Sequence, residues 1–458
     1  LIAAPYDGRA LGPAINHLRR PMAETALWGM PIMAGRDLAA FLSAMRDWRS
    51  FAHVAGRLVR HARDMLRHGR AMQLVNGSAL VARLMASAMR VGVQWRLNTP
   101  ALALGRDGEG VVRHVIIADG AGRRVLRARR AVVLATGGFP QNAALRAEYF
   151  GYAGAGAHHY SVAVGEADGA GLAMAQGVGG VLDRGVCAAG AWCPVSIVPY
   201  AGGRTGHFPH IIERAKAGII AVRADGRRFV NEANGYHDYV AALLAATPAG
   251  DVAQSWLICD HRFQREFGLG ITRPFPFSTR RWRANGYLRR APTLDALAQI
   301  CGIDAAGLAG TIARYNADAA AGVDGEYGRG STPYNRVQGD ARCAPNPNVR
   351  PMGAGPYYAV RVVPGSFGTF AGLATDGDAR ALDQHGAPIP GLYVAGNDMA
   401  SVMGGHYPAG GINLGPAMTF GYIAARHILA HPAPANPANP ATARNARPAY
   451  SAHNARSL

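Results

Sequence analysis

The sequence predicts an α/β fold in which a discontinuous α/β domain carries an inserted α+β domain. A chain of 458 residues can bury a sizeable core and is expected to form two domains rather than one. Two apolar runs, residues 131–135 and 392–395, have the length of buried strands, and each is followed by a glycine-containing loop. In the middle of the chain this pattern stops and aromatic residues and prolines become more frequent. These observations predict three segments: residues 1–190, the insertion 191–355 and the returning segment 356–430.

The first segment is expected to contain mainly helices. Apolar residues at helical spacing, with arginines between them, predict one amphipathic helix over residues 37–67 and a second over 80–89. Residues 165–180 alternate small and apolar side chains between glycines, which predicts a closely packed helix.

A β-hairpin is predicted directly before the first buried strand. The pair Asp119-Gly120 suits a tight turn between residues 111–118 and 125–128. The strand 131–135 then follows.

The insertion is expected to contain both strands and helices. Residues 218–222 and 228–230 are predicted strands around a turn at 224–226, and helices are predicted at 294–300 and 306–316. The chain is expected to leave the insertion near Tyr357. The last segment, residues 431–458, repeats proline, alanine and asparagine, cannot bury a core, and is expected to be disordered.

The charge of the chain argues against nucleic acid as the ligand. The formal net charge is +19, but Lys216 is the only lysine, and the arginines are scattered without an interleaved aromatic stripe. Such an arginine bias, with abundant alanine and glycine, is typical of a coding preference, although it is compatible with steering of anionic ligands.

The cysteines and the hydropathy indicate a soluble cytoplasmic protein without metal or disulfides. The five cysteines show no CxxC motif and no repeated spacing, which favours reduced thiols. The neighbouring histidines His158-His159 and the pair His207 and His210 have no acidic or thiol partner at metal-ligand spacing. No apolar run is long enough to span a bilayer, and no secretory signal opens the chain.

The segment from Gly391 to Arg426 carries the strongest pattern in the chain. A predicted strand ends in Val-Ala-Gly, followed by Asn397 and Asp398, and a glycine-rich loop then enters a helix with Pro416 at its expected first position. A loop that places backbone N–H groups and a helix N-terminus beside a strand end suits an electron-rich ligand.

These residues resemble the C-terminal motif of the fumarate reductase and 3-ketosteroid dehydrogenase flavoprotein superfamily. Three further segments match the family in order: the one that begins at Asn76, the strand that ends in Ala-Thr-Gly-Gly138, and Arg227-Arg-Phe-Val-Asn-Glu232. The resemblance implies a Rossmann-like FAD-binding domain with an inserted α+β substrate-capping domain. The FAD-binding residues that it implies are Gly77, Ser78, Ala135, Thr136, Gly137, Gly138, Asn397, Asp398, Asn413 and Leu414.

The family's pyrophosphate loop is not found in this sequence. We find no G-x-G-x-x-G, and Tyr6-Asp-Gly-Arg-Ala-Leu-Gly12 resembles an interior segment of these flavoproteins. We therefore expect an N-terminally truncated fragment that lacks the first mononucleotide-binding unit.

The resemblance also implies a pair of catalytic tyrosines. Dehydrogenation beside a ketone requires an electrophile for the carbonyl oxygen, a base for the α-proton and a hydride acceptor. In the 3-ketosteroid Δ1-dehydrogenases, a tyrosine and a glycine at the spacing of Tyr407 and Gly411 bind the steroid C3 oxygen. Tyr236 matches the tyrosine base of the motif Asn-Glu-x-x-Pro-Tyr, with Gly235 in place of the proline. His237 is expected to point elsewhere, on an extended segment.

The same positions disfavour a C4-dicarboxylate site. Fumarate reductases carry an arginine acid where Tyr236 stands, and a substrate-binding histidine where this chain has Gly368. The predicted function is therefore FAD-dependent α,β-dehydrogenation of a 3-ketosteroid or similar ketone in steroid metabolism, with an external electron acceptor. The alternatives are a fumarate-reductase-like enzyme acting on another enoate, or a non-catalytic truncated remnant.

Overall fold

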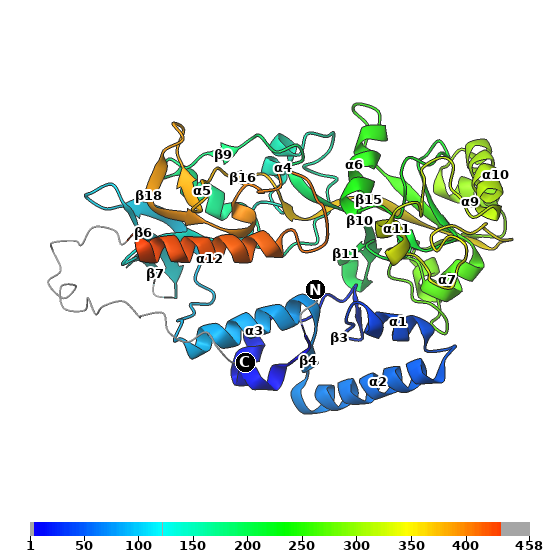
Figure 1. Cartoon of the computed structure of the whole chain (residues 1–458), viewed down its shortest axis with the longest axis horizontal. Helices are drawn as coiled ribbons and strands as arrows, with labels where there is room; N and C mark the ends of the chain where they lie inside the picture. The colour runs from blue at the N-terminus through cyan, green and yellow to red at the C-terminus, as the bar shows by residue number, and fades with distance from the viewer. Residues whose placement is uncertain (1–3, 121, 432–458) are drawn as a thin grey trace.

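The structure is a computed structural model that describes residues 4–120 and 122–431. The predicted disordered tail, residues 431–458, lies outside the described residues except for His431. The two parts of the chain lie side by side along the long axis, with the N-terminal helices beneath them in Figure 1.

The inserted part is built on a six-stranded sheet with the long strand β15, Tyr357–Thr369, at its centre. Strand β10, Gly190–Pro199, pairs antiparallel with β15 on one side, and β13, Ser255–Cys259, pairs antiparallel with it on the other. The outer strands are β11 (Thr205–Pro209), β12 (Ile219–Val222) and β14 (Arg289–Ala291). Its helices are α6 (Tyr236–Ala246), α7 (His261–Phe267), α8 (Arg280–Ala284), α9 (Leu294–Cys301), α10 (Ala305–Ala320) and α11 (Pro333–Gln338).

The second part contains the two buried strands predicted near the glycine-rich loops. Strand β8, Val132–Leu134, pairs parallel with β18, Pro388–Val394, in the register Leu392↔Val132, and β17, Arg380–Leu382, lies on the other side of β18. Because β8 and β18 are parallel and in register, their carboxyl ends open at the same edge, which is where open α/β sheets bind ligands. The helices of this part are α4 (Ala143–Tyr149), α5 (Ala170–Gln176) and α12 (Leu414–Ala430).

The two parts share one core. A single cluster of buried apolar residues runs from Leu134 and Val394 in the parallel pair to Val360 and Leu257 in the six-stranded sheet. The predicted boundary at 190/191 falls at the beginning of β10, but β15 lies after the predicted boundary at 355/356 and still forms the centre of the inserted part's sheet. Strand β10, which begins the inserted part, and strand β15, which ends it, pair with each other in the sheet.

The N-terminal segment forms a separate layer. A 3₁₀ segment, Gly8–His17, packs against α3, Asn76–Arg90, and β1 (Tyr6–Asp7) pairs with β4 (Gln73–Leu74). Short strands β2 (Ala26–Leu27) and β3 (Met30–Pro31) pair before α1, and β9 (Leu182–Asp183) pairs with β16 (Gly372–Leu373).

The helix predicted over residues 37–67 is two helices. Helix α1 spans Arg36–Ser43 and α2 spans Trp48–His68. Asp47 begins the second helix, because its carboxylate accepts the backbone N–H groups of Arg49 and Ser50. The apolar spacing continues across residues 44–47, but the N-cap at Asp47 starts a new helix there, so one predicted helix is observed as two.

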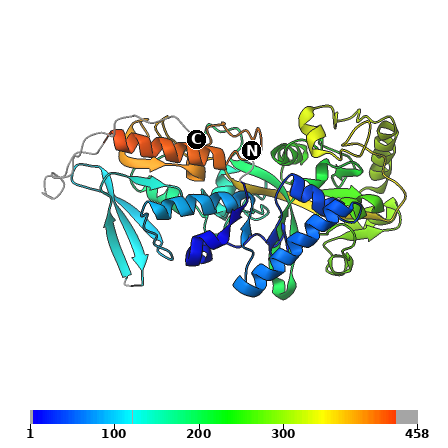
Figure 2. The ribbon, with the colours of Figure 1, turned by 60° about the horizontal axis from the view of Figure 1, so that its bottom comes forward.

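The predicted hairpin is part of a three-stranded sheet. Strands β6, Val112–Asp119, and β7, Gly122–Arg127, pair as predicted, and β5, Ala101–Arg106, joins β6 on its other edge. Figure 2 shows this sheet extending away from the body of the molecule.

Three local predictions were wrong. Residues 228–230 form no strand, because the Arg228 side chain is buried in ion pairs rather than alternating across a sheet. The helix predicted over 165–180 is limited to α5, which follows Gly169 at φ +89°. Pro416 is the third residue of α12 and not the first, a position still within the turn whose N–H groups have no helical acceptor.

Candidate active site

The structure brings the two predicted tyrosines into direct contact. The Tyr236 hydroxyl donates a hydrogen bond of 2.7 Å to the Tyr407 hydroxyl, across 171 residues of sequence. The rings meet edge to face, with centroids 4.9 Å apart. One phenol comes from the first residue of α6 and the other from the loop before α12, so both parts of the molecule contribute to the pair.

Tyr236 is held by a helix start and by apolar neighbours. Gly235 is the N-cap of α6, and the Tyr236 ring packs edge to face on Phe367 at a centroid distance of 5.2 Å. Cys193, Val195 and Val363 of β10 and β15 form the buried surface beneath the ring.

His237 does not point away from this pair, contrary to the prediction. Because residue 236 begins a helix instead of continuing an extended segment, the His237 ring lies 5.7 Å from that of Tyr407. The Trp192 backbone N–H donates to His237 Nδ1 at 3.2 Å, which assigns the hydrogen of the neutral ring to Nε2.

Burial keeps all three groups uncharged near neutral pH. Desolvation raises the pKa of Tyr236 well above its usual range, and the adjacent Tyr407 raises it further. Desolvation also raises the pKa of Tyr407, although the hydrogen bond from Tyr236 opposes this. Burial, with a smaller contribution from His406, lowers the pKa of His237 to about 4. Both phenols of the site therefore keep their hydroxyl hydrogens near neutral pH.

The glycines after Tyr407 bring backbone close to the pair. A Cβ on Gly410 would lie 3.9 Å from the Tyr236 hydroxyl, and Gly411 has φ +101°, a conformation that favours glycine. The Gly411 carbonyl accepts the N–H groups of Leu414 and Gly415, whereas its own N–H has no acceptor among residues 4–120 and 122–431. The loop thus leaves one backbone donor without a protein acceptor, four residues after Tyr407.

Three of the four segments predicted to bind the cofactor meet at the carboxyl ends of β8 and β18. The buried Asp398 carboxylate accepts hydrogen bonds from the Thr136 hydroxyl at 2.9 Å and the Gly138 N–H at 2.8 Å, and it also binds the Thr136 N–H. Asp398 therefore ties the loop after β8, from Ala135 to Gly138, to the loop after β18.

A cleft lies between that junction and the beginning of α12. Asn397, Asn413 and Pro416 line it, and Leu414 begins the helix beside it. The side-chain amides of Asn397 and Asn413 have no hydrogen-bond partner within the described part of the chain. Gly77 and Ser78 stand apart in the first turn of α3, and no hydrogen bond joins them to these segments.

A buried ionic cluster holds the turn that leads to Tyr236. Arg228 forms ion pairs with Glu232 at 2.7 Å and Asp324 at 2.8 Å, and Arg329 pairs with Glu232 at 3.2 Å. Arg214 donates to the backbone carbonyls of Glu232 and Asn234. The sequence analysis used Arg227–Glu232 only as a family match; a run of charged residues inside an apolar segment was the available signal for this cluster.

Asparagines complete the support of the same turn. Asn231 Nδ2 donates to Asn335 Oδ1 at 3.0 Å, and Asn335 Nδ2 donates to Asn234 Oδ1 at 3.0 Å. Asn335 belongs to α11, about a hundred residues away, so its role was not visible in the sequence.

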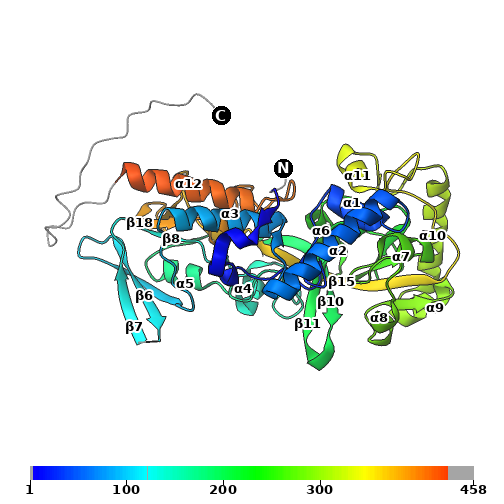
Figure 3. The ribbon, with the colours of Figure 1, turned by 90° about the horizontal axis from the view of Figure 1, so that it is seen from below.

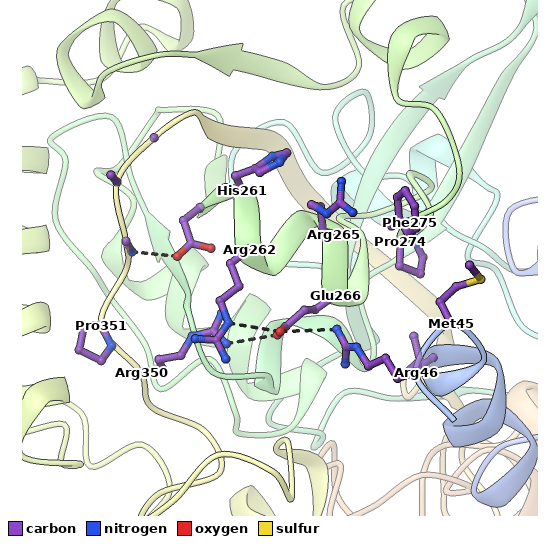
Figure 4. A pocket seen from close by; sticks show the side chains of 15 residues that line it. Met45, Arg46, His261, Arg262, Arg265, Glu266, Pro274, Phe275, Arg350 and Pro351 are labelled. Carbon is purple, nitrogen blue, oxygen red and sulfur yellow. Dashed lines mark hydrogen bonds and ion pairs between the residues drawn. The ribbon is translucent and has the colours of Figure 1, made fainter. Parts of the chain in front are cut away.

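A cavity of about 910 Å³, shown in Figure 4, is not lined by Tyr236 or Tyr407. It lies between α1 and α7, and its walls contain none of the predicted site residues. Glu266 in the cavity wall forms ion pairs with Arg46, Arg262 and Arg350, so the charge of this carboxylate already has protein partners.

A second cavity, of about 270 Å³, is mainly apolar; Tyr236 and Tyr407 are not among its lining residues, but one strand pairing links it to the pair. It is lined by Phe41, Phe208, Ile212 and Ile271, among other apolar residues, and includes Pro209. Pro209 pairs with Val195, on which Tyr236 packs. Its two cations are engaged, because Lys216 donates to two backbone carbonyls and Arg273 to that of Ala26.

The histidine pairs considered as metal ligands have other partners. His159 bonds to the hydroxyls of Tyr152 and Ser366, and His210 to Glu213. Within residues 4–120 and 122–431 no three His, Cys, Asp or Glu side chains are grouped to hold a metal ion. Over the same residues, no helix is both long and apolar enough to cross a membrane.

Comparison with known proteins places this arrangement among flavoproteins. A family model described as an FAD binding domain matches residues 3–414. The chain is 37% identical over 422 residues to 4-oxocyclohex-2-ene-1-carboxylate 5-dehydrogenase of Sinomonas cyclohexanicum, covering 92% of this chain and 71% of that protein. It is 37% identical over 362 residues to 3-oxosteroid 1-dehydrogenase of Mycobacterium tuberculosis, covering 77% of this chain and 62% of that protein.

A solved structure shows the same fold. The crystal structure of 3-ketosteroid Δ1-dehydrogenase from Sterolibacterium denitrificans, in complex with 1,4-androstadiene-3,17-dione, matches with a TM-score of 0.83 and 33% sequence identity. The match covers 94% of this chain and 77% of that chain.

Proposed function

This chain belongs to the FAD-binding domain family, and from that premise we propose that it dehydrogenates the α,β carbon–carbon bond of a cyclic ketone. The observation that carries the proposal is the hydrogen bond between Tyr236 and Tyr407, whose loop continues into Gly411 with an N–H that has no acceptor among the described residues. The activity and the roles of individual residues are proposals, because the chain spans 62% of the length of the 3-oxosteroid relative.

The residues at the β8–β18 edge fit FAD, the cofactor of the family. The unpaired amides of Asn397 and Asn413 offer donors and acceptors to a ring edge that carries both, such as the flavin pyrimidine. Asp398 supports the site from beneath, since its oxygens are occupied by the loop after β8. When bound, FAD would supply the acceptor for the hydride that leaves the β-carbon of the substrate.

The tyrosine pair can move a proton without creating a phenolate. In the proposed step Tyr407 donates its hydrogen to the ketone oxygen, Tyr236 passes its hydrogen to Tyr407, and the substrate α-proton goes to Tyr236. The product is a neutral enol, and each phenol regains one hydrogen. This route suits phenols whose pKa is raised by burial, because neither has to ionise.

The relatives and the apolar cavity support a proposal for the substrate class. A cavity lined mainly by aromatic and aliphatic side chains supports a 3-ketosteroid or another apolar cyclic ketone. The second candidate is a 4-oxocyclohexane or cyclohexene carboxylate, favoured by the relative that covers 92% of this chain. Lys216 and Arg273 are the cations in this cavity wall, and each already binds backbone carbonyls, which favours the uncharged ketone.

Fumarate reduction has weaker support. A Cβ at Gly368 would come within 2.0 Å of the Asn397 side-chain nitrogen, so an imidazole there requires displacement of that amide. The contact with a substrate carboxylate that the fumarate reductases make through a histidine at this position is therefore not available to Gly368.

The test is flavin bleaching by a panel of compounds. The chain is mixed with FAD and then with a 3-oxosteroid, 4-oxocyclohexanecarboxylate, 4-oxocyclohex-2-ene-1-carboxylate and, after dithionite reduction, fumarate. We expect the 3-oxosteroid to bleach the flavin, and Tyr407→Phe to slow bleaching about 10²–10³-fold, the usual effect of removing one oxyanion donor. Faster reduction by a carboxylate would establish the second candidate.

A further comparison separates a working enzyme from a remnant. The rate of flavin bleaching by each compound is compared between the unmodified chain and the double variant Tyr236→Phe, Tyr407→Phe. If the chain binds FAD but every compound bleaches the flavin equally fast in both proteins, the dehydrogenase assignment is wrong. If no FAD is retained, the same panel is applied to a longer gene product that contains this chain, and lack of bleaching there would support the remnant.

A further inference from the structure

Helix α2 turns a stripe of apolar side chains outward and directs several polar side chains inward, and we infer that it binds the surface of an anionic lipid bilayer. The helix lies on the lower side of the molecule in Figure 1 and in front of β10 and β15 in the view from below in Figure 3. This inference goes beyond the proposed catalytic function and does not depend on it.

The inward face of α2 carries polar side chains that bond to α1 and to the segments around Trp28 and Met72. Buried Asp37 of α1 accepts hydrogen bonds from Arg57 and from His53 at 2.6 Å. His61 bonds to the Trp28 carbonyl at 3.1 Å, and Asp64 accepts the Met72 N–H at 3.1 Å. Rotating the helix to bury its apolar side would break these bonds, which fixes the orientation.

The outward face is a continuous apolar stripe. Residues 48, 51, 55, 59, 62 and 66 recur every three or four positions, so they lie along one side of the helix. Its four large members are Trp48, Phe51, Val59 and Leu66, with 74%, 58%, 62% and 89% of their surface exposed. A capped helix of this length holds the stripe rigidly, because Asp47 closes its beginning and Gly69 its end.

Arginines border the stripe and no exposed acid lies within the helix. Arg49, Arg60, Arg63 and Arg67 are exposed, and none forms an ion pair with a described residue. The one acid inside α2, Asp64, is buried. Arginines beside a Trp-, Phe- and Leu-bearing face are the composition of helices that lie in the headgroup layer of a membrane.

The charge decides which occupant fits the stripe. Two copies of this chain, each with a net charge of +19, would bring both sets of arginines together across a shared stripe. An anionic bilayer offers hydrocarbon for Trp48 and Leu66 and negative headgroups for the arginines at the same depth. The helix contains too many arginines to cross a membrane, which leaves it in the plane of the surface.

The experiment is co-sedimentation of the full chain with vesicles. Equimolar phosphatidylcholine and phosphatidylglycerol are compared with phosphatidylcholine alone. We expect binding to the mixed vesicles, weakened as added salt screens the arginines. Trp48→Gln with Leu66→Gln should reduce the partition coefficient at least about tenfold. Arg60→Gln, Arg63→Gln and Arg67→Gln together should reduce it roughly a hundredfold.

Two control variants make the same kinds of substitution, apolar to Gln and Arg to Gln, at exposed positions away from α2. Val337→Gln removes a side chain that is 86% exposed on α11, and the triple variant Arg227→Gln, Arg283→Gln, Arg290→Gln removes the same charge from the inserted part. Both should bind vesicles like the unmodified chain. Brominated lipid should quench the fluorescence of the unmodified chain, and Trp48→Phe should remove most of this quenching while leaving binding within about threefold.

Three results would overturn the proposal. They are equal binding by the stripe variant and the Val337 control, equal binding to phosphatidylcholine alone, and a dimer in solution that Trp48→Gln with Leu66→Gln dissociates. Circular dichroism of each variant checks that α2 remains folded; a stripe variant that lost helix would be replaced by the milder Leu66→Ala.

Discussion

Two buried polar clusters stand on the same short stretch of chain and differ in what they leave free. In the ionic cluster, both Glu232 oxygens accept hydrogen bonds, one from the Ala221 N–H and Arg228 and the other from Arg228 and Arg329. In the tyrosine pair, only the bond from Tyr236 to Tyr407 is made, and the Tyr407 hydrogen has no acceptor within residues 4–120 and 122–431. The Glu232 carboxylate has all its acceptor positions engaged and supports the chain, whereas the Tyr407 hydroxyl is available to a ligand.

The contrast separates motif from role. Arg227–Glu232 and Tyr236 are part of one sequence motif, yet four residues after Glu232 the chain has turned from the interior to the site. Arg214 and Asn335 hold that turn from two other parts of the chain. One sequence motif therefore contains both a residue that stabilises the turn, Glu232, and the residue proposed to react, Tyr236.

The largest expected effect is at Tyr236. Tyr236→Phe keeps the packing on Phe367 but removes the proton acceptor, so flavin reduction by a good ketone substrate should fall by about 10⁴-fold, the upper range for a general base. Exchange of the substrate α-proton with solvent, followed by NMR, should be lost in parallel. Exchange retained at the wild-type rate would remove Tyr236 from this role.

Breaking the ionic cluster should act on stability instead. Glu232→Gln leaves two buried guanidinium groups short of a carboxylate, which should lower the free energy of unfolding by about 3–5 kcal/mol. Urea unfolding measures this, with Tyr236→Phe as a control that changes it by less than about 1 kcal/mol. If Glu232→Gln were as stable as the wild type, the cluster would not be the support of the turn.

Low pH should destabilise the protein through the ionic cluster and not through the tyrosine pair. Burial raises the pKa of Glu232 and Asp324, but Arg228 outweighs it and the net shift is downward. Their contribution is present above the unfolded-state values, near pH 4, and is lost as the pH falls through the lower folded-state values. The urea midpoint should therefore drop from about pH 5 downward, equally in wild type and Tyr236→Phe, because the phenols carry no charge there. A smaller acid sensitivity in Tyr236→Phe would contradict the separation.

The smallest expected effect is at the N-cap between the clusters. Gly235 has φ −51° and ψ 146°, which other residues adopt, and makes no side-chain cap. Gly235→Ser adds a capping hydroxyl, and its Cβ would lie 3.0 Å from an Asp238 oxygen, which is the end of a side chain and can shift; stability should therefore change by only a few tenths of a kcal/mol. Flavin reduction should stay within about twofold of wild type, in keeping with that small shift. A large loss of activity at unchanged stability would show that the glycine itself positions Tyr236.

The sequence by itself determined the elements that depend on local pattern and on residue identity. The buried strands near residues 132 and 392, the 112–127 hairpin and the helices at 294–301 and 305–320 follow from apolar periodicity and turn residues, and the structure contains all of them. The tyrosines and the asparagines of the β8–β18 edge were identified from motifs in family order. These features could be predicted because each rests on residues that are neighbours in the chain.

Only the tertiary structure decided which side each polar residue faces. That Asp398 holds the loop after β8, that Arg228 pairs across 96 residues with Asp324, and that Tyr236 reaches Tyr407 depend on contacts between distant segments. The same holds for α2, whose amphipathic pattern predicts a helix but does not say which face is buried. There the bonds of Asp37 and Met72 to its polar side fixed the orientation, because an unpaired buried polar group costs more than an exposed apolar one gains by burial.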